Sequence, residues 1–193
     1  FVSTIKKEVA KMKGCRALNE NEVKHIIENM VDAKGRLLAL TGLYFGTRIS
    51  EALALNFDDV SGNMLSLKSA KGSNNQTFQI TPAYKRALAE VKEQYRAKGW
   101  VVNGDTALFL SQSGVRMTQQ AASYIVKTAA KKANLEGKIN NHSFRKCFVT
   151  KIYSLTGCDI AQTKQYSRHK SLASLDYYIA TTSGTELVNN LNW

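Results

Sequence analysis

Two adjacent tyrosines near the end of the chain, Tyr177 and Tyr178, are the first residues that could do chemistry. They lie in the segment SRHKSLASLDYYIA, with His169 upstream. A phenol with a reference pKa of about 10 is protonated at neutral pH, and in that form it is a weak nucleophile. Cations lower the cost of forming the phenolate, so such a group suits covalent catalysis in a cationic pocket. The chemistry therefore depends on which cations the rest of the chain supplies.

A first source of cations is the segment NNHSFRKCF, which places His142 and Arg145 three residues apart. Near a helix start both side chains can project toward one point, where backbone N–H groups also favour an anion. The pattern predicts an anion site, although H-x-x-R also occurs by chance. We expect an apolar stripe on another face to anchor this helix: Phe144, Phe148, Ile152 and Leu155.

A second source is the segment GTRISEALAL, in which Arg48 follows the Gly46-Thr47 break and precedes an apolar helix. Arg48 and Glu51 are three residues apart, so they share a face and can pair. An arginine at a helix start is unfavourable for the helix dipole, which indicates a local anion or carboxylate partner. A surface ion pair would explain the same two residues.

Helical phase separates the two tyrosines. At about 100° per residue, Leu172, Leu175 and Ile179 fall within about 60° of one another and define a buried stripe. Tyr177 lies almost opposite this stripe and Tyr178 at its border. Because a border position is sheltered and held in place, the phase favours Tyr178 as a positioned nucleophile.

The composition favours a polyanionic partner. The 193 residues contain 27 Lys and Arg against 15 Asp and Glu, a formal charge of +12. Nucleic acid is the leading candidate, because neutralising phosphates releases counterions. A basic protein kept soluble by its charge, or an anionic membrane surface, are the alternatives. No apolar run approaches the ~20 residues of a membrane span.

Metal and cofactor chemistry find no support in the sequence. The three cysteines, Cys15, Cys147 and Cys158, lack metal-ligand spacing, and we expect reduced thiols in a cytosolic protein. No metal ligand and no cofactor site is predicted.

The elements that must position these residues are mainly helices. Capping and apolar periodicity predict helices from Asn19, after Thr81-Pro82 up to Gly99, and after Thr118. Further apolar or helical segments are expected at 37–43, 49–55, 143–156, 159–166 and 171–181. Leu65 and Leu67 alternate with polar residues before the turn KGSNN, and Phe78 and Ile80 alternate after it, which predicts a β-hairpin.

The predicted fold class is therefore mainly α with a small antiparallel β-sheet, in one domain. Residues 1–17 are interpreted as a basic arm or linker remnant, 18–182 as the catalytic domain and 183–193 as a C-terminal tail. The tail could dock on a neighbouring protomer or pack on its own core. The chain begins at Phe1, so we expect a fragment that lacks an N-terminal partner domain.

The order of these motifs resembles the catalytic domain of tyrosine recombinases, the phage-integrase family. The resemblance rests on GTRISEALAL, a hairpin lysine, HSFR and RHKSLASLDYY, and it covers roughly residues 15–185. It implies that Arg48, Lys71, His142, Arg145 and His169 are catalytic and that Tyr178 is the nucleophile, nine residues after His169. Lys68 is the alternative to Lys71, and Glu51 matches the acidic residue that supports the first arginine.

Two departures from the family pattern surround these residues. Ser167-Arg168 stands where the family usually has Leu-Gly, and Ile179-Ala180 where many members have Thr-His. Neither removes a catalytic group. Arg168 is expected to contact DNA phosphate, as is Lys170, or to alter how the turn before His169 packs.

The resemblance implies site-specific cutting and rejoining of double-stranded DNA through a 3′-phosphotyrosyl intermediate, without metal or ATP. It also implies a homo-oligomer, a tetrameric synapse on DNA, acting at the nucleoid of a bacterium or of a phage host. Two alternatives remain: a type IB topoisomerase that relaxes DNA, and a catalytically decayed DNA-binding module.

Overall fold

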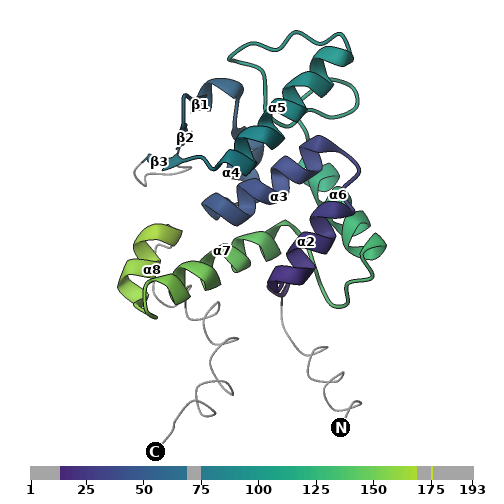
Figure 1. Cartoon of the computed structure of the whole chain (residues 1–193). Helices are drawn as coiled ribbons and strands as arrows, with labels where there is room; N and C mark the ends of the chain where they lie inside the picture. Colours follow the sequence, from purple (N-terminus) through teal and green to yellow (C-terminus); the bar gives the residue numbers. More distant parts are fainter. Residues whose placement is uncertain (1–13, 69–74, 169–174, 176–193) are drawn as a thin grey trace, which may run out of the picture.

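Helices form most of the described chain, residues 14–68, 75–168 and 175 of a computed structural model, and a small sheet accompanies them (Figure 1). This arrangement confirms the predicted fold class, mainly α with a small antiparallel sheet. The helices are α2 (Glu20–Glu28), α3 (Ala33–Phe45), α4 (Ile49–Ala54), α5 (Pro82–Ala97), α6 (Gln119–Lys132), α7 (Asn141–Leu155) and α8 (Ile160–Ser167). A short 3-10 helix, η1 (Phe57–Asp59), precedes the sheet.

The predicted caps begin three of these helices. The side chain of Asn19 accepts the N–H of Glu22 at 2.9 Å, and the Glu22 carboxylate accepts the N–H of Asn19 at 3.0 Å. Thr81 accepts from Tyr84 at 3.2 Å with Pro82 in the first turn, and Thr118 caps α6. Local side-chain chemistry therefore sets where these helices start.

The sheet has three antiparallel strands in the order β1 (Val60–Ser61), β2 (Met64–Leu67) and β3 (Gln76–Gln79). Leu65 pairs with Phe78, which confirms the predicted hairpin. The sequence did not predict β1, because a two-residue strand is too short to show alternation. Residues 69–74 of the hairpin turn, with Lys71, lie outside the described residues.

Helix α3 lies between α5 on one side and α7 on the other (Figure 1). A Cβ at Gly42 would lie 2.8 Å from the Cβ of Phe144, so the glycine allows α3 and α7 to approach closely. On the α5 side, the rings of Phe45 and Tyr84 meet edge to face with centroids 4.9 Å apart. Helix α3 therefore shares its core with both neighbours.

The predicted apolar stripe of α7 is right for its first three members and wrong for the last. Phe144 and Phe148 are buried and Ile152 is partly buried, whereas Leu155 is 71% exposed. Leu155 is the last residue of the helix, beyond the part that packs against the body. Leu175, from the predicted stripe of 171–181, is fully buried and packs with Phe148 and Val149.

The turn between α3 and α4 depends on Gly46. Its φ of +56° lies in the left-handed region, which glycine adopts without steric cost. A Cβ at this position would also collide with the ring of Phe148. Gly46 therefore lets the chain turn against α7 and start α4 directly afterwards.

Candidate active site

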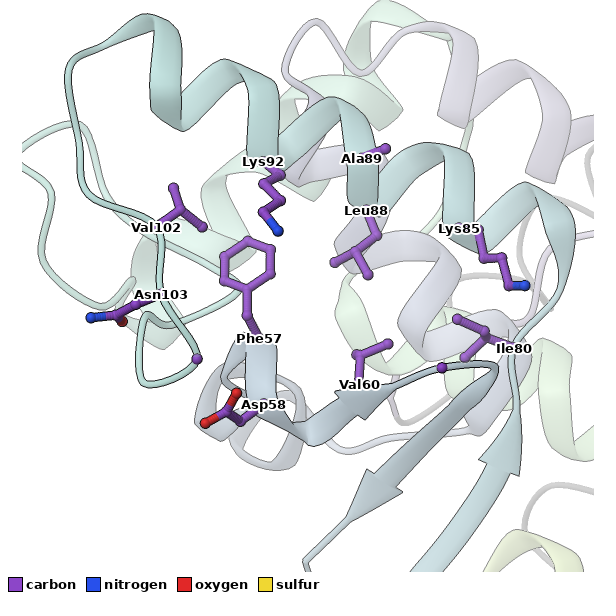
Figure 2. A pocket seen from close by; sticks show the side chains of 12 residues that line it. Phe57, Asp58, Val60, Ile80, Lys85, Leu88, Ala89, Lys92, Val102 and Asn103 are labelled. Carbon is purple, nitrogen blue, oxygen red and sulfur yellow. The ribbon is translucent and has the colours of Figure 1, made fainter.

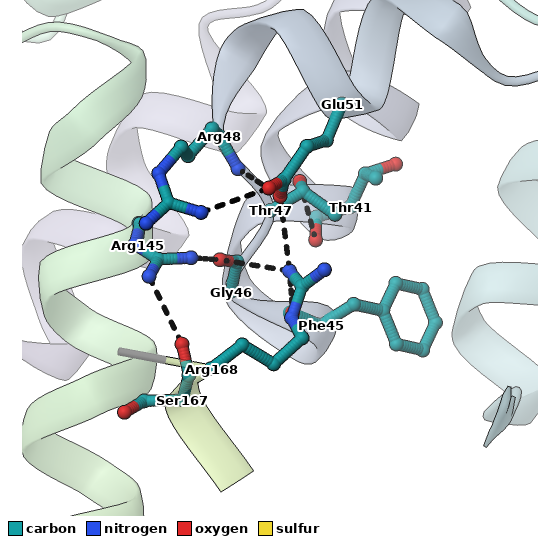
Figure 3. A network of polar contacts seen from close by, with 9 residues as sticks. All are labelled: Thr41, Phe45, Gly46, Thr47, Arg48, Glu51, Arg145, Ser167 and Arg168. Atoms are coloured by element: carbon teal, nitrogen blue, oxygen red, sulfur yellow. Dashed lines mark hydrogen bonds and ion pairs between the residues drawn. The ribbon is translucent and has the colours of Figure 1, made fainter. Parts of the chain in front are cut away.

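Arg48 lies at the start of α4, where its backbone and side chain both bind Glu51. The Arg48 N–H donates to Glu51 Oε2 at 2.9 Å, and its Nη1 donates to Glu51 Oε1 at 2.9 Å. The Arg48 side chain is 47% exposed, whereas that of Glu51 is only 7% exposed. The carboxylate is thus buried, and it pairs with an arginine whose side chain is nearly half exposed (Figure 3).

Arg145 reaches the same place from the second turn of α7. Its Nη1 donates to the carbonyl of Gly46, and its Nη2 donates to the carbonyl of Ser167 at 2.9 Å (Figure 3). The residue is 1% exposed. Arg145 therefore links α7 to the α3–α4 turn and to the end of α8. The sequence predicted that Arg145 projects toward an anion from a face other than the buried stripe, and its burial corrects that expectation.

Arg168 completes the cluster from the C-terminal end of α8. Its Nη2 donates to Glu51 Oε2 at 3.1 Å, to the Phe45 carbonyl at 3.3 Å and to the Gly46 carbonyl at 3.4 Å. Its side chain is 13% exposed. Of the two roles predicted from the sequence, a phosphate contact or a role in packing of the turn, these contacts favour the second.

The charges of the cluster keep Glu51 ionised. Burial alone would raise the pKa of Glu51, but the Arg48 N–H and the charges of Arg168 and Arg48 outweigh it, so the pKa is lowered. The carboxylate pairs with two guanidinium groups, those of Arg48 and Arg168, and a third, that of Arg145, lies nearby at the Gly46 carbonyl (Figure 3). The cluster therefore carries net positive charge, which suits an anionic ligand such as a phosphate.

His142 occupies the first turn of α7, and its N–H donates to the cap residue Asn140 at 2.9 Å. Burial of the imidazole, and then the charges of Arg145, Lys146 and Arg48, lower the pKa of His142 below its ordinary value. A neutral imidazole near cations can accept a proton at neutral pH. The site thus combines anion-binding arginines with a candidate proton acceptor.

Several predicted site residues cannot be placed with this cluster. Lys71, His169, Lys170, Tyr177 and Tyr178 lie outside the described residues. Lys68, the alternative hairpin lysine, is described: its Nζ lies 3.1 Å from Asp59 Oδ1 and its side chain is 79% exposed. The structure therefore brings together Arg48, Glu51, His142 and Arg145, with Arg168 joining them.

A hollow lies elsewhere, between the sheet and α5 (Figure 2). It has a volume of about 490 Å³, an apolar wall of Phe57, Val60 and Leu88, and two lysines, Lys85 and Lys92. None of the three arginines lines it. Among the described residues, no group of three or more His, Cys, Asp or Glu side chains is arranged to hold a metal.

Sequence reasoning missed the carbonyl groups that the arginines bind, and it left the direction of Arg168 open between DNA and the turn. Carbonyl groups carry no side-chain signal in a sequence. For Arg168 a signal existed, because a large residue stands where the resembled family usually has glycine, and the backbone there has φ +57°. An arginine in that conformation indicates that its side chain compensates for the strain.

Comparisons with known proteins show which family the sequence matches. The sequence model described as Phage integrase family matches residues 16–184. The chain is 32% identical over 179 residues to tyrosine recombinase XerD of Corynebacterium glutamicum, covering 86% of this chain and 57% of that protein. It is 29% identical over 155 residues to tyrosine recombinase XerC of Caldanaerobacter subterraneus, covering 78% and 43%.

The fold agrees as well. The crystal structure of the XerH site-specific recombinase bound to palindromic difH substrate, a post-cleavage complex, matches with a TM-score of 0.70 at 23% identity. The match covers 89% of this chain and 51% of that chain. The chain thus spans about half the length of the proteins it matches. Within its described part, no helix combines the length and apolarity that crossing a membrane requires.

Proposed function

This chain belongs to the phage integrase family, and from that membership we propose that it is a site-specific recombinase that cuts and rejoins DNA strands through Tyr178. The observation that supports this most is the meeting of Arg48 and Arg145. They come from motifs about a hundred residues apart, yet both lie at the Gly46 turn, together with Glu51 and next to His142. A phosphate-binding pair of arginines beside a proton acceptor is what phosphoryl transfer without a metal requires.

The proposed partner is double-stranded DNA. The formal charge of +12 provides long-range attraction to a polyanion. The cluster provides a local site of matching charge. Arg48 is the arginine that meets the phosphate first, because nearly half of its side chain is exposed. Arg145 supports it from below, and a phosphate would compete with the carbonyls of Gly46 and Ser167 for its donors.

The proposed reaction has one bond formed and one broken in each strand cleavage. The Tyr178 oxygen attacks the phosphorus, the bond to the DNA 5′-oxygen breaks, and a 3′-phosphotyrosyl bond remains. His142 takes the tyrosine proton, and Lys71 gives a proton to the leaving 5′-oxygen. Arg48 and Arg145 stabilise the negative charge that develops on the phosphate, with a hydrogen bond from His169.

The covalent intermediate explains how strands are rejoined without ATP. The phosphotyrosyl bond retains the energy of the cleaved phosphodiester, so a 5′-hydroxyl of another strand can attack it. Recombination between two sites implies a synapse of four protomers on DNA. We also propose that the tail 183–193 docks on a neighbouring protomer. A further N-terminal domain and action at the nucleoid are proposed with it.

Covalent capture tests the proposal. Duplexes with a nick and a randomised core are mixed with the chain, and protein–DNA adducts are counted on a denaturing gel. The wild-type chain and Tyr177→Phe should form adducts, while Tyr178→Phe should form none and still bind DNA. Adducts with Tyr178→Phe, or none with the wild-type chain on any duplex, would overturn the assignment. Supercoil relaxation without exchange between two sites would indicate a topoisomerase instead.

A further inference from the structure

We infer that Arg168 is a positioning residue for Arg48, acting through Glu51, and not a residue that contacts DNA. This inference rests on the proposed function. It starts from the two oxygens of the Glu51 carboxylate. Oε1 accepts from Arg48 Nη1 at 2.9 Å, and Oε2 accepts from the Arg48 N–H at 2.9 Å and from Arg168 Nη2 at 3.1 Å.

The first effect of Arg168 is on charge. A buried carboxylate paired only with Arg48 would neutralise the guanidinium that is proposed to bind phosphate. With Arg168 sharing Glu51, two positive groups face one negative group, so a net positive charge remains for the phosphate. The side chains of Glu51 and Arg168 are only 7% and 13% exposed, so solvent screens this balance weakly.

The second effect of Arg168 is on geometry. Its guanidinium joins the end of α8 to the carbonyls of Phe45 and Gly46, at the C-terminal end of α3 and three and two residues before Arg48. It also lies 6.0 Å from the ring centroid of Phe78 on β3. The strand β3 leads out of the hairpin that carries Lys71. One side chain therefore connects α8, the turn before Arg48 and the sheet.

The backbone supports the same inference. Arg168 has φ +57° and ψ +35°, a left-handed conformation that glycine adopts far more easily than arginine. Glycine would suit the turn alone. A residue with a long cationic side chain at this position is explained by what the side chain contacts.

The decisive variant is Arg168→Gly, which suits the backbone and removes the side chain. Single-turnover cleavage of the nicked duplex, with saturating protein, should fall by about 10-fold to 100-fold. The reason is that the Arg48 guanidinium is displaced or its charge is neutralised by Glu51. The affinity for DNA should fall much less than the rate, because the other basic residues of the chain remain, and any loss of salt dependence should return when Glu51→Gln is added. Adding Glu51→Gln to Arg168→Gly should recover part of the rate, because the unbalanced carboxylate is gone.

Arg36→Ala is the matched control. Arg36 also donates to one carbonyl, that of Met30 at 2.9 Å, and to one carboxylate, that of Glu90 at 2.8 Å, but far from the cluster. The Arg36→Ala variant should lose contacts of the same kinds, and its cleavage rate should stay unchanged. If Arg168→Gly does not fold, as judged by circular dichroism, Arg168→Met takes its place, since its thioether side chain is long and unbranched but donates to none of the three acceptors. Its cleavage rate should also fall.

Two results would overturn the inference. One is a wild-type cleavage rate in the folded variant. The other is a salt slope that drops by about 0.9 and does not recover with Glu51→Gln, which would mean that Arg168 itself neutralises a DNA phosphate. Either result leaves the proposed function intact as long as the wild-type chain forms adducts. If the wild-type chain captures no DNA at all, the proposed function fails, and the inference fails with it.

Discussion

Arg48 and Arg145 belong to one cluster but lie in opposite environments. Arg48 stands at a helix start with a side chain that is 47% exposed and contacts Glu51. Arg145 is 1% exposed and donates to the carbonyls of two other segments. The difference separates two tasks. An exposed arginine can serve the ligand at little cost to the fold, whereas a buried one holds the fold and the ligand site together.

The largest expected effect is that of Arg145→Ala. Removing this side chain takes one donor from the carbonyl of Gly46 and one from the carbonyl of Ser167, and it opens a cavity between α7 and α8. We expect the free energy of unfolding to fall by about 3 kcal/mol, a loss of roughly 6–12 °C in Tm, and cleavage to be lost. Thermal unfolding and covalent capture measure the two effects.

Arg116→Ala is the control for that experiment. Arg116 donates to the carbonyl of Leu53 at 2.6 Å and to Asn56 at 2.6 Å, outside the cluster. It should lower the Tm without lowering the cleavage rate of the folded protein. An Arg145→Ala variant with wild-type Tm would show that the buried arginine does not hold the segments together.

The next effect is that of Arg48→Ala, which should separate catalysis from stability. Cleavage should fall on the order of 10²-fold to 10³-fold, as for other removed donors to a developing oxyanion. The free energy of unfolding should change by less than about 1 kcal/mol, because the arginine of the pair is nearly half exposed and the buried Glu51 keeps its contacts to the Arg48 N–H and to Arg168.

Arg96→Ala provides the match, since Arg96 also pairs three residues away, with Glu93 at 2.6 Å, on the exposed face of α5. It should change neither quantity. Equal cleavage rates for Arg48→Ala and Arg96→Ala would remove Arg48 from the mechanism.

A smaller effect is expected at the turn that both arginines share. Gly46→Ala forces alanine into φ +56° and against Phe148, whereas Gly62→Ala imposes the same strain at φ +57° in open space. We expect about 1 kcal/mol of destabilisation at Gly62 and about 1–3 kcal/mol more at Gly46. Chemical denaturation measures both. Equal losses would mean that α7 can move away from the turn without cost.

The smallest effect is on the titration of His142, on which both arginines act. Its pKa is lowered below 6.5 by burial and by the charges of Arg145, Lys146 and Arg48. Since the unfolded state binds more protons as the pH falls through 6.5, the contribution of His142 to stability decreases below that pH. NMR titration of the free chain, with the signal assigned by His142→Asn, should give a midpoint below 6.5.

In Arg48→Ala that midpoint should move upward, because one of the repelling charges is gone. A midpoint above 6.5 in the wild-type chain would contradict the environment described for His142.

Local patterns predicted much of the fold and little of the architecture of the site. The caps at Asn19, Thr81 and Thr118 are interactions within one turn, so the sequence shows them directly. The burial of Arg145 is different, because its acceptors are carbonyl groups of segments distant in the chain. No periodicity reveals such contacts.

The error at Leu155 has a related cause. Helical phase predicts on which face of a helix a residue lies. It does not predict whether another element packs against that face at the end of the helix. The pair Arg48 and Glu51 was predicted correctly as a local ion pair, since three residues on one helix turn suffice to define it. The contact of Arg168 with Glu51 could not be predicted in this way, because the two residues are distant in the sequence and meet only in the folded chain.

The central claim is that Tyr178 is the nucleophile that the arginine cluster serves. The most direct measurement is proteolysis of the covalent protein–DNA adduct, followed by mass spectrometry of the peptide that carries the nucleotide. We predict a phosphotyrosyl bond at Tyr178, joined to the 3′ end of the cleaved strand. A nucleotide on Tyr177 or on any other residue, or a bond to a 5′ end, would contradict the account.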